Sequence, residues 1–123
     1  MAYSIRIESY FSAAHRLRGY EGKCESLHGH NWKVEAVISS EKLGKVGMVL
    51  DFKKAKSLLS GIVSQLDHQE LNKIAHFKKH NPTSELIAEF IFKKYEKKFK
   101  LPLALKSVTV WETPTSSATF CKD

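Results

Sequence analysis

The chain of 123 residues predicts an α+β fold, in which a four-stranded antiparallel sheet carries two helices on one face. Three observations lead to this prediction. Polar and apolar residues alternate from Tyr3 to His15 and again after His28, which is the period of a strand. Apolar residues then recur at helical spacing in two central segments, and alternation returns between 107 and 121. The predicted order is two strands, two helices and two strands in one domain, 1–123.

The first two predicted strands each have an inward face. These faces hold, in order along the chain, Tyr3, Ile5, Ile7, Phe11, Ala13 and His15, and then His30, Trp32, Val34, Ala36 and Ile38. If the strands pair antiparallel, His15 at the end of one face lies beside His28 and His30 at the start of the other. The connection between them, residues 16–27, is long for a small domain, which is typical of a functional loop.

The two predicted helices follow a turn at residues 41–47. Asp51 suits the N-cap of the first helix, which is expected to end near Leu66. Asn81 and Pro82 are expected to open the second helix, with Pro82 in its first turn. The two apolar stripes are Ala55, Leu58, Leu59, Ile62, Val63 and Leu66, and Leu86, Ile87, Phe90, Ile91, Tyr95 and Phe99. After Pro102, residues 107–113 and 117–121 read as the last two strands.

A metal site is the first functional prediction. His28 and His30 are two residues apart, so both rings leave the same face of a strand. Catalytic zinc sites usually take three protein ligands and keep one position open, and His15 lies on the matching parity. The residues therefore favour a zinc site of His15, His28 and His30. The alternative is that some of the six histidines lie at strand ends by chance.

Four further residues are candidates for chemistry. Cys24 has no expected disulfide partner in a chain without a secretory signal, so it is interpreted as a free thiol or as a fourth zinc ligand. Asp67 and His68 can form an acid/base pair, although such a dipeptide is common. Glu112 ends an apolar strand face, where a carboxylate needs a ligand or a buried partner unless it lies at the surface.

Composition excludes several classes of protein. The N-terminus has no basic and apolar signal pattern and no apolar run is long enough to cross a bilayer, so we expect a cytoplasmic protein without membrane contact. The net charge of +7 comes mostly from lysines at positions expected on solvent-facing helix surfaces. No nucleic-acid motif accompanies these lysines, so no nucleic-acid partner is expected, although the charge can steer an anionic substrate.

Five motifs in order resemble one family. They are F-S-A-A-H, C-x-x-x-H-G-H, L-D-H, N-P-T-S-E and W-E-T, and together they extend over nearly the whole chain. This pattern is similar to the 6-pyruvoyltetrahydropterin synthase superfamily, and within it to the 6-carboxytetrahydropterin synthases of queuosine biosynthesis. Animal pyruvoyl synthases carry five residues between Cys and H-G-H, whereas this chain carries three.

The resemblance implies a fold, a reaction and residue roles. The fold is the tunnelling fold, in which three subunits join their sheets into a barrel, two barrels stack into a hexamer, and active sites lie between subunits. The reaction is the conversion of 7,8-dihydroneopterin triphosphate to 6-carboxytetrahydropterin, acetaldehyde and triphosphate by a zinc-dependent carbon–carbon lyase. Cys24 matches the general base and Asp67 with His68 the proton relay. Glu112 matches the anchor of the aminopyrimidine and is a further catalytic candidate, coupled to this relay. Thr83 and Ser84 match residues that approach the pterin ring, although capping of the second helix is the alternative explanation for them.

Three alternatives stay open at this point. The chain could make 6-pyruvoyltetrahydropterin, which the three-residue spacing after Cys24 disfavours. It could be a non-catalytic metal-binding or assembly protein, in which case Cys24 and His68 would be dispensable. It could also be a basic RNA-binding domain, which the lack of interleaved basic and aromatic residues disfavours.

Overall fold

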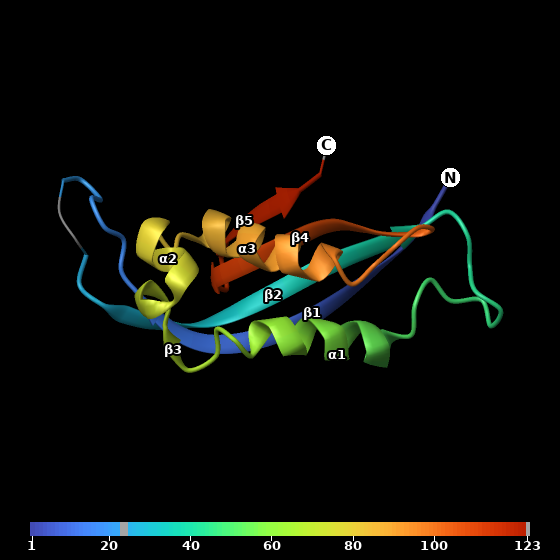
Figure 1. Ribbon diagram of the computed structural model, residues 1–123, viewed down its shortest axis with the longest axis horizontal. Coiled ribbons are helices and arrows are strands. Elements are labelled where there is room, and N and C mark those ends of the chain that lie inside the picture. Colours follow the sequence, from blue (N-terminus) through green and yellow to red (C-terminus); the bar gives the residue numbers. More distant parts are fainter. Residues whose placement is uncertain (23–24, 123) are drawn as a thin grey trace.

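The central element of this computed structural model, which describes residues 1–22 and 25–122, is a sheet with helices over one face (Figure 1). Its long strands are β1 (Tyr3–His15), β2 (His28–Ser40), β4 (Leu103–Thr113) and β5 (Ser116–Cys121). These four strands pair antiparallel in the order β1-β2-β4-β5. The predicted α+β class and the four long strands are confirmed. A two-residue strand that the sequence did not predict, β3 (Gln69–Glu70), pairs parallel with the end of β1.

The register of β1 and β2 puts the expected inward faces together. Phe11 lies opposite Trp32, and their rings stack with centroids 5.7 Å apart. Ala13 lies opposite His30, and His15 lies opposite His28. Because side chains alternate between the two faces of a sheet, this register sends the apolar residues of both strands into one core. The histidine-bearing ends of the two strands therefore meet at one corner of the sheet.

Two helices cover the inward face. Helix α1 (Phe52–Val63) begins after Asp51, whose side chain accepts a hydrogen bond from the Lys53 backbone N–H as an N-cap does. Its α-helical part stops at Val63, earlier than expected, although Leu66 in the following turn is still fully buried. A 3₁₀ turn (Leu71–Lys73) and the short helix α2 (Ala75–Lys79) follow. Neither is long enough to produce a helical period in the sequence.

Helix α3 (Ser84–Glu96) begins two residues later than predicted. Thr83 is its N-cap, because the Thr83 hydroxyl accepts a hydrogen bond from the Leu86 backbone N–H at 3.1 Å. Pro82 therefore precedes the cap, and its placement in the first turn was wrong. Asn81 could also cap a helix, but its side chain hydrogen-bonds to the Arg18 backbone, so the Thr83 hydroxyl satisfies the orphan helix N–H instead.

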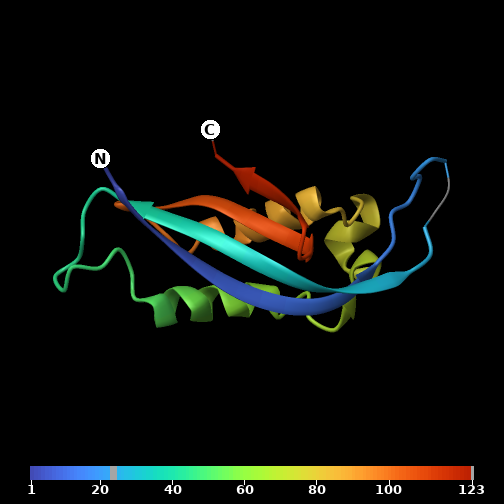
Figure 2. The ribbon, with the colours of Figure 1, turned by 180° about the vertical axis from the view of Figure 1, so that it is seen from behind.

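The core lies between the helices and the sheet. Its largest fully buried side chains are Trp32, Tyr95, Phe77 and Phe92. Tyr95 also links the two main helices, because its hydroxyl donates a hydrogen bond to the Ala55 carbonyl at 2.7 Å. Figure 2 shows the other face of the sheet, over which no helix of the described chain passes. The helices and the apolar core thus lie on the same face of the sheet as the three histidine side chains.

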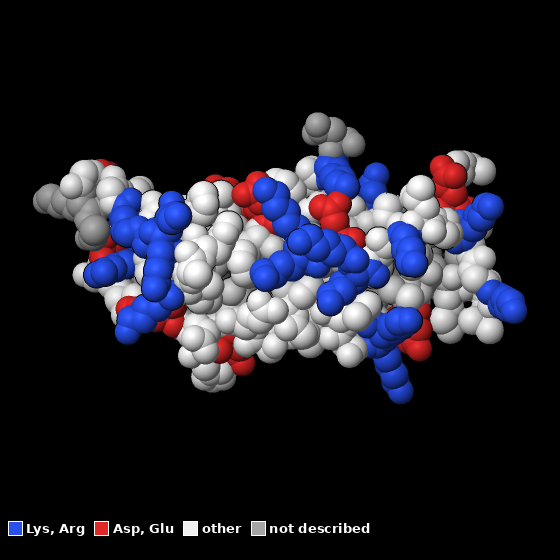
Figure 3. Space-filling model, viewed as in Figure 1, with Lys and Arg blue, Asp and Glu red and all other residues white. Residues whose placement is uncertain are grey.

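Basic side chains are spread over the helix-bearing face, with acidic side chains among them (Figure 3). Most of the helical lysines are exposed, as expected for solvated helix surfaces. Lys94 is an exception, since it is half-buried with its ammonium 5.0 Å from the centre of the Phe90 ring. In the described part of the chain, no helix combines the length and apolar character that crossing a bilayer requires.

Candidate metal centre and active-site cleft

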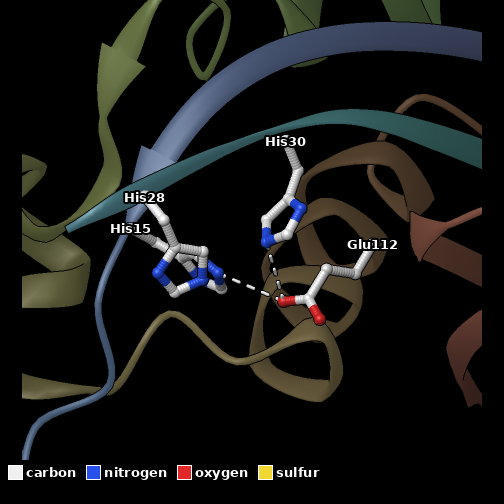
Figure 4. Close-up of side chains that lie close together, drawn as sticks. All are labelled: His15, His28, His30 and Glu112. Atoms are coloured by element: carbon white, nitrogen blue, oxygen red, sulfur yellow. Dashed lines mark ion pairs between the residues drawn. The ribbon is translucent and has the colours of Figure 1, made fainter. Parts of the chain in front are cut away.

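Three imidazoles converge where β1 and β2 meet (Figure 4). The ring centroids of His15 and His28 lie 4.7 Å apart, those of His28 and His30 lie 4.9 Å apart, and those of His15 and His30 lie 5.3 Å apart. One ligand atom from each ring and one carboxylate oxygen of Glu112 all lie within 4.8 Å of one another. The strand parity anticipated the three histidines, and Glu112 joins them from β4.

Backbone carbonyls orient two of these rings. His15 Nδ1 lies 2.8 Å from the Pro82 carbonyl oxygen, and His28 Nδ1 lies 2.8 Å from the Ser26 carbonyl oxygen. A carbonyl oxygen only accepts, so Nδ1 carries the proton in both rings and Nε2 holds a lone pair when the ring is neutral. Histidines that bind metals are held in this way by partners on their other nitrogen.

The surroundings favour a neutral His30 ring. Burial lowers the pKa of His30, and the neighbouring His15 and His28 lower it further against the opposing effect of Glu112. Nε2 of His15 and Nε2 of His30 are both buried, and neither finds a hydrogen-bond partner within the described chain. Buried polar atoms without partners are costly unless a ligand satisfies them. Three neutral imidazoles with a carboxylate form a donor set that zinc accepts, so these residues fit a zinc ion.

Glu112 reaches this corner from the end of β4, on the same parity as the buried Val108 and Val110. The register of β4 against β5 shifts between Trp111 and Thr113, so Glu112 lies at the irregularity. Glu112 Oε1 lies 3.1 Å from His15 Nε2 and 3.7 Å from His30 Nε2. The sequence predicted that this carboxylate needs a ligand or a buried partner, and His15 is such a neighbour in this structure.

The cluster opens into a cleft of about 840 Å³. His30 and Glu112 form part of its wall, and His68 forms another part. The remaining described lining residues are Ser12, Ala13, Ala14, Gly29, Asn31, Gln69, Glu70, Thr113 and Pro114. A concave site with a few convergent polar and titratable groups is the expected form of a small-molecule site.

Asp67 and His68 form an ion pair at the rim of this cleft. His68 Nδ1 lies 3.0 Å from Asp67 Oδ2, and the His68 side chain is 81% exposed. A backbone hydrogen bond from Ser12 lowers the pKa of Asp67 below its ordinary value, outweighing partial desolvation, and His68 lowers it further. Asp67 therefore stays negative at neutral pH and holds the Nδ1–H side of the His68 ring, which leaves Nε2 free to exchange a proton.

The backbone at His68 is strained and is held in place by β1. His68 has φ of +58°, a left-handed conformation that costs roughly 1–2 kcal/mol for a residue with a Cβ. Ser12 fixes this turn from both sides, because its N–H donates to Asp67 Oδ1 at 2.9 Å and its carbonyl accepts from the His68 N–H at 2.6 Å. Strain that neighbouring structure maintains is frequent at functional sites.

Cys24 lies outside the described residues, but both flanks of its loop are anchored. Arg16 exchanges two backbone hydrogen bonds with the Asn72 side chain, and Arg18 exchanges two with the Asn81 side chain. Glu25 donates from its backbone N–H to the Leu17 carbonyl and accepts the Leu17 N–H at its side chain. The loop therefore leaves and re-enters the fold beside the histidine corner.

The Asn81–Thr83 stretch has three structural tasks in this fold. Asn81 binds Arg18, the Pro82 carbonyl orients His15, and Thr83 caps α3. Neither Thr83 nor Ser84 is among the described residues that line the cleft. The N-P-T motif drew attention to this stretch, but a main-chain contact such as that of Pro82 leaves no signature in residue type.

Comparisons with known proteins agree with one another on the family. The model of the 6-pyruvoyl tetrahydropterin synthase family matches residues 4–123. The chain is 42% identical over 118 residues to 6-carboxy-5,6,7,8-tetrahydropterin synthase of Synechocystis sp., which covers 92% of this chain and 88% of the relative. It is 40% identical over 102 residues to dihydroneopterin monophosphate aldolase of Pyrococcus furiosus, which covers 83% and 82%.

A solved structure of a family member has the same fold as this chain. The structure of Caenorhabditis elegans 6-pyruvoyl tetrahydropterin synthase superposes with a TM-score of 0.87 at 31% identity, covering 100% of this chain and 97% of the other. This likeness confirms the tunnelling fold for the single subunit, and the assembly stays a prediction. The ordered strands, the histidine corner and the near full-length matches lead to one conclusion. The chain belongs to the 6-pyruvoyl tetrahydropterin synthase family.

Proposed function

We propose that this chain is a zinc-dependent 6-carboxy-5,6,7,8-tetrahydropterin synthase, which converts 7,8-dihydroneopterin triphosphate and one water to 6-carboxytetrahydropterin, acetaldehyde and triphosphate in queuosine biosynthesis. The observation that carries the proposal is the cluster of His15, His28, His30 and Glu112 at the wall of the cleft. It combines a set of metal donors with a carboxylate open to a ligand. The near full-length similarity to the Synechocystis sp. synthase supports the choice of reaction.

The three imidazoles would hold the zinc ion, with His15 and His28 fixed by backbone carbonyls. When bound, zinc would supply Lewis acidity toward the side-chain oxygens of the substrate. Glu112 would bind the other end of the substrate, because a carboxylate accepts two parallel N–H donors from the edge of an aminopyrimidine. Thr83 and Ser84 are proposed to approach the pterin ring.

Proton transfer would fall to Cys24 and to the Asp67–His68 pair. A thiol has an ordinary pKa of about 8.5, and a nearby cation lowers it, so a thiolate general base is reasonable at neutral pH. His68 would carry the second proton at the cleft, with the Asp67 carboxylate orienting the ring from 3.0 Å away at Nδ1. The hydrogen bonds of Ser12 to Asp67 and to the His68 N–H hold this turn, with His68 in the wall of the cleft.

A second candidate reaction is favoured by the similarity to the Pyrococcus furiosus aldolase. A retro-aldol cleavage of dihydroneopterin monophosphate would break the side chain between its first two carbons, leaving a hydroxymethyl pterin and a phosphorylated two-carbon aldehyde. It would use the same imidazoles and the same proton relay. The third possibility, 6-pyruvoyltetrahydropterin formation, loses triphosphate without breaking a carbon–carbon bond.

One experiment separates the three reactions. The zinc-loaded protein is incubated with 7,8-dihydroneopterin triphosphate and, separately, with the monophosphate, and the pterin products are identified by mass. We expect a carboxypterin from the triphosphate, and none when zinc has been removed with a chelator. A pyruvoyl product from the triphosphate, or a hydroxymethyl product from the monophosphate alone, would overturn the proposal in favour of the corresponding alternative.

A further inference from the structure

Ser12 on β1 binds three groups at the wall of the cleft. Its backbone N–H donates to Asp67 Oδ1 at 2.9 Å, and its carbonyl accepts from the His68 N–H at 2.6 Å. Its side-chain hydroxyl donates to Asn31 Oδ1 at 2.7 Å, across the β1–β2 register in which Ser12 and Asn31 are opposite. The backbone of Ser12 thus fixes the turn that carries His68, and its hydroxyl fixes the Asn31 amide.

The hydrogen bond from Ser12 decides which half of the Asn31 amide is left for a ligand. An asparagine side chain carries an accepting oxygen and a nitrogen with two donors in one plane. Because the Ser12 hydroxyl occupies the oxygen, Nδ2 and its two N–H groups lie on the other side of the amide. This is the one hydrogen bond of the Asn31 side chain within the described chain, and the residue is exposed. Asn31 therefore offers two oriented donors.

The position of Asn31 brings these donors to the cleft. Within residues 1–22 and 25–122, the ladder between β2 and β4 ends at the pair of Lys33 and Trp111. The start of β2 therefore pairs with β1 alone and keeps one edge open. Successive side chains of a strand leave opposite faces, yet His30 and Asn31 both line the cleft. The open end of β2 thus contributes groups from both of its faces.

Neutral donors complement the other polar groups of this cleft. Glu70 and Glu112 line it, and an ionised carboxylate accepts hydrogen bonds but donates none. A ligand that is rich in oxygen atoms, such as a hydroxylated or phosphorylated side chain, needs donors instead. The amide of Asn31 supplies them at any pH, because it does not titrate, and Ser12 has already oriented it. Preorganised donors of this kind bind an oxygen without a cost of reorganisation.

We propose that Nδ2 of Asn31 donates to an oxygen of the substituent at C6 of the pterin, either a hydroxyl or a phosphate oxygen, and that Ser12 is its positioning residue. This inference rests on the proposed function for the class of ligand. The contact transfers no proton and breaks no covalent bond. Ser12 thereby links the donor that holds the substrate side chain to the turn that carries His68, the proposed proton carrier.

The test measures binding of three oxidised, unreactive ligands to the zinc-loaded full chain by isothermal titration calorimetry. Pterin has no substituent at C6, neopterin adds hydroxyls, and neopterin triphosphate adds hydroxyls and phosphates. We expect Asn31→Leu to weaken binding of neopterin, of its triphosphate, or of both by about 3- to 10-fold, while pterin binds as it does to the wild type. Ser12→Ala should cause a smaller loss with the same ligands, because the amide stays but is no longer held.

Thr109→Val is the matched control. Its hydroxyl lies 2.7 Å from the Thr119 hydroxyl, so it removes a cross-strand contact of the same length on the same face of the sheet. Thr109 is not among the described residues that line the cleft, so this variant should bind all three ligands as the wild type does. Zinc content and the urea midpoint are measured for each variant, and Asn31→Asp, which keeps the acceptor for Ser12 and loses the donors, gives a second variant of nearly the same shape.

The pattern across the ligands identifies the oxygen that is held. A loss with neopterin assigns the contact to a hydroxyl, and a loss confined to the triphosphate assigns it to a phosphate oxygen. Unchanged affinity for both in Asn31→Leu and Asn31→Asp, or an equal loss that includes pterin, would overturn the inference. A wild type that binds none of the three ligands would instead refute the proposed function, and this inference with it.

Discussion

Among single residues, substitution of Cys24 and substitution of a histidine ligand should impair different properties of the protein. If Cys24 is the general base, Cys24→Ala removes proton transfer and leaves the metal site intact. We expect it to retain zinc and to bind a non-reactive pterin, while turnover falls by about 10² to 10⁴-fold. The exposed Cys121 on β5 gives the control, since Cys121→Ala should change neither property. If Cys24→Ala also loses its zinc, the thiol is a metal ligand and its proposed role as general base is refuted.

His28 should be needed for metal rather than for folding. It stands at the first residue of β2 and is only half-buried, so removal of its ring leaves the core untouched. We expect His28→Ala to lose zinc on dialysis, with an affinity drop larger than the 10- to 100-fold that is typical of outer-shell changes. His80→Ala, at the exposed end of α2, should keep its zinc. Stoichiometric zinc in His28→Ala, measured by metal analysis after dialysis, would exclude the assigned site.

Among the elements, the link between α1 and α3 gives a stability prediction. Burial of Tyr95 raises the pKa of its hydroxyl, so the group stays protonated and donates to Ala55. Tyr95→Phe leaves that bond unmade in a dry environment, and we expect a loss of about 1 kcal/mol of unfolding free energy. Urea unfolding would measure it, with Tyr3→Phe at the exposed start of β1 as the control. A Tyr95→Phe protein as stable as the wild type would show that the bond contributes nothing net.

The turn between α1 and β3 should show a pH-dependent contribution. Folding lowers the pKa of Asp67 below its ordinary 3.8, chiefly through the Ser12 N–H. The resulting stability is present above about pH 3.8 and is lost as the pH falls through the lower folded-state value. At pH 7, Asp67→Asn should therefore unfold at a lower urea concentration than the wild type. Near pH 3 the difference between their two urea midpoints should become smaller. Both proteins are compared with chelator present, and a gap of constant size would contradict the linkage.

Periodicity made the elements predictable wherever one face of a segment is buried. The alternation in Tyr3–His15 gave the extent of β1 and, through parity, the meeting of His15 with His28. It could not give β3 or α2, because two and five residues are too few for a period. Parity put Glu112 on the inward face of β4, but strand periodicity gives no distance between strands that are not neighbours, so it could not predict the 3.1 Å approach of Glu112 to His15. The predicted catalytic roles stay predictions.

For the whole molecule, the open edges of the sheet predict assembly. In the described chain, β5 pairs only with β4, and β3 covers β1 only at Ala13 and Ala14. Long unpaired edges are normally covered or used to join subunits. We expect a homo-oligomer in which three subunits join their sheets and two such rings stack as a hexamer of 14.0-kDa chains. Sedimentation at decreasing concentration would measure its mass, and a fully active monomer would contradict both the assembly and a site shared between subunits.

The carbonyl contacts of His15 and His28 have a consequence for how this site can evolve. Pro82 and Ser26 hold the rings through main-chain oxygens, which every amino acid supplies. Substitution at position 26 or 82 can therefore alter the side chain and leave the tautomers of both imidazoles as they are, provided that the backbone path is kept. The metal centre therefore tolerates amino-acid substitutions at positions 26 and 82. A laboratory search for altered metal preference should find its gains at Glu112 and at the histidines themselves.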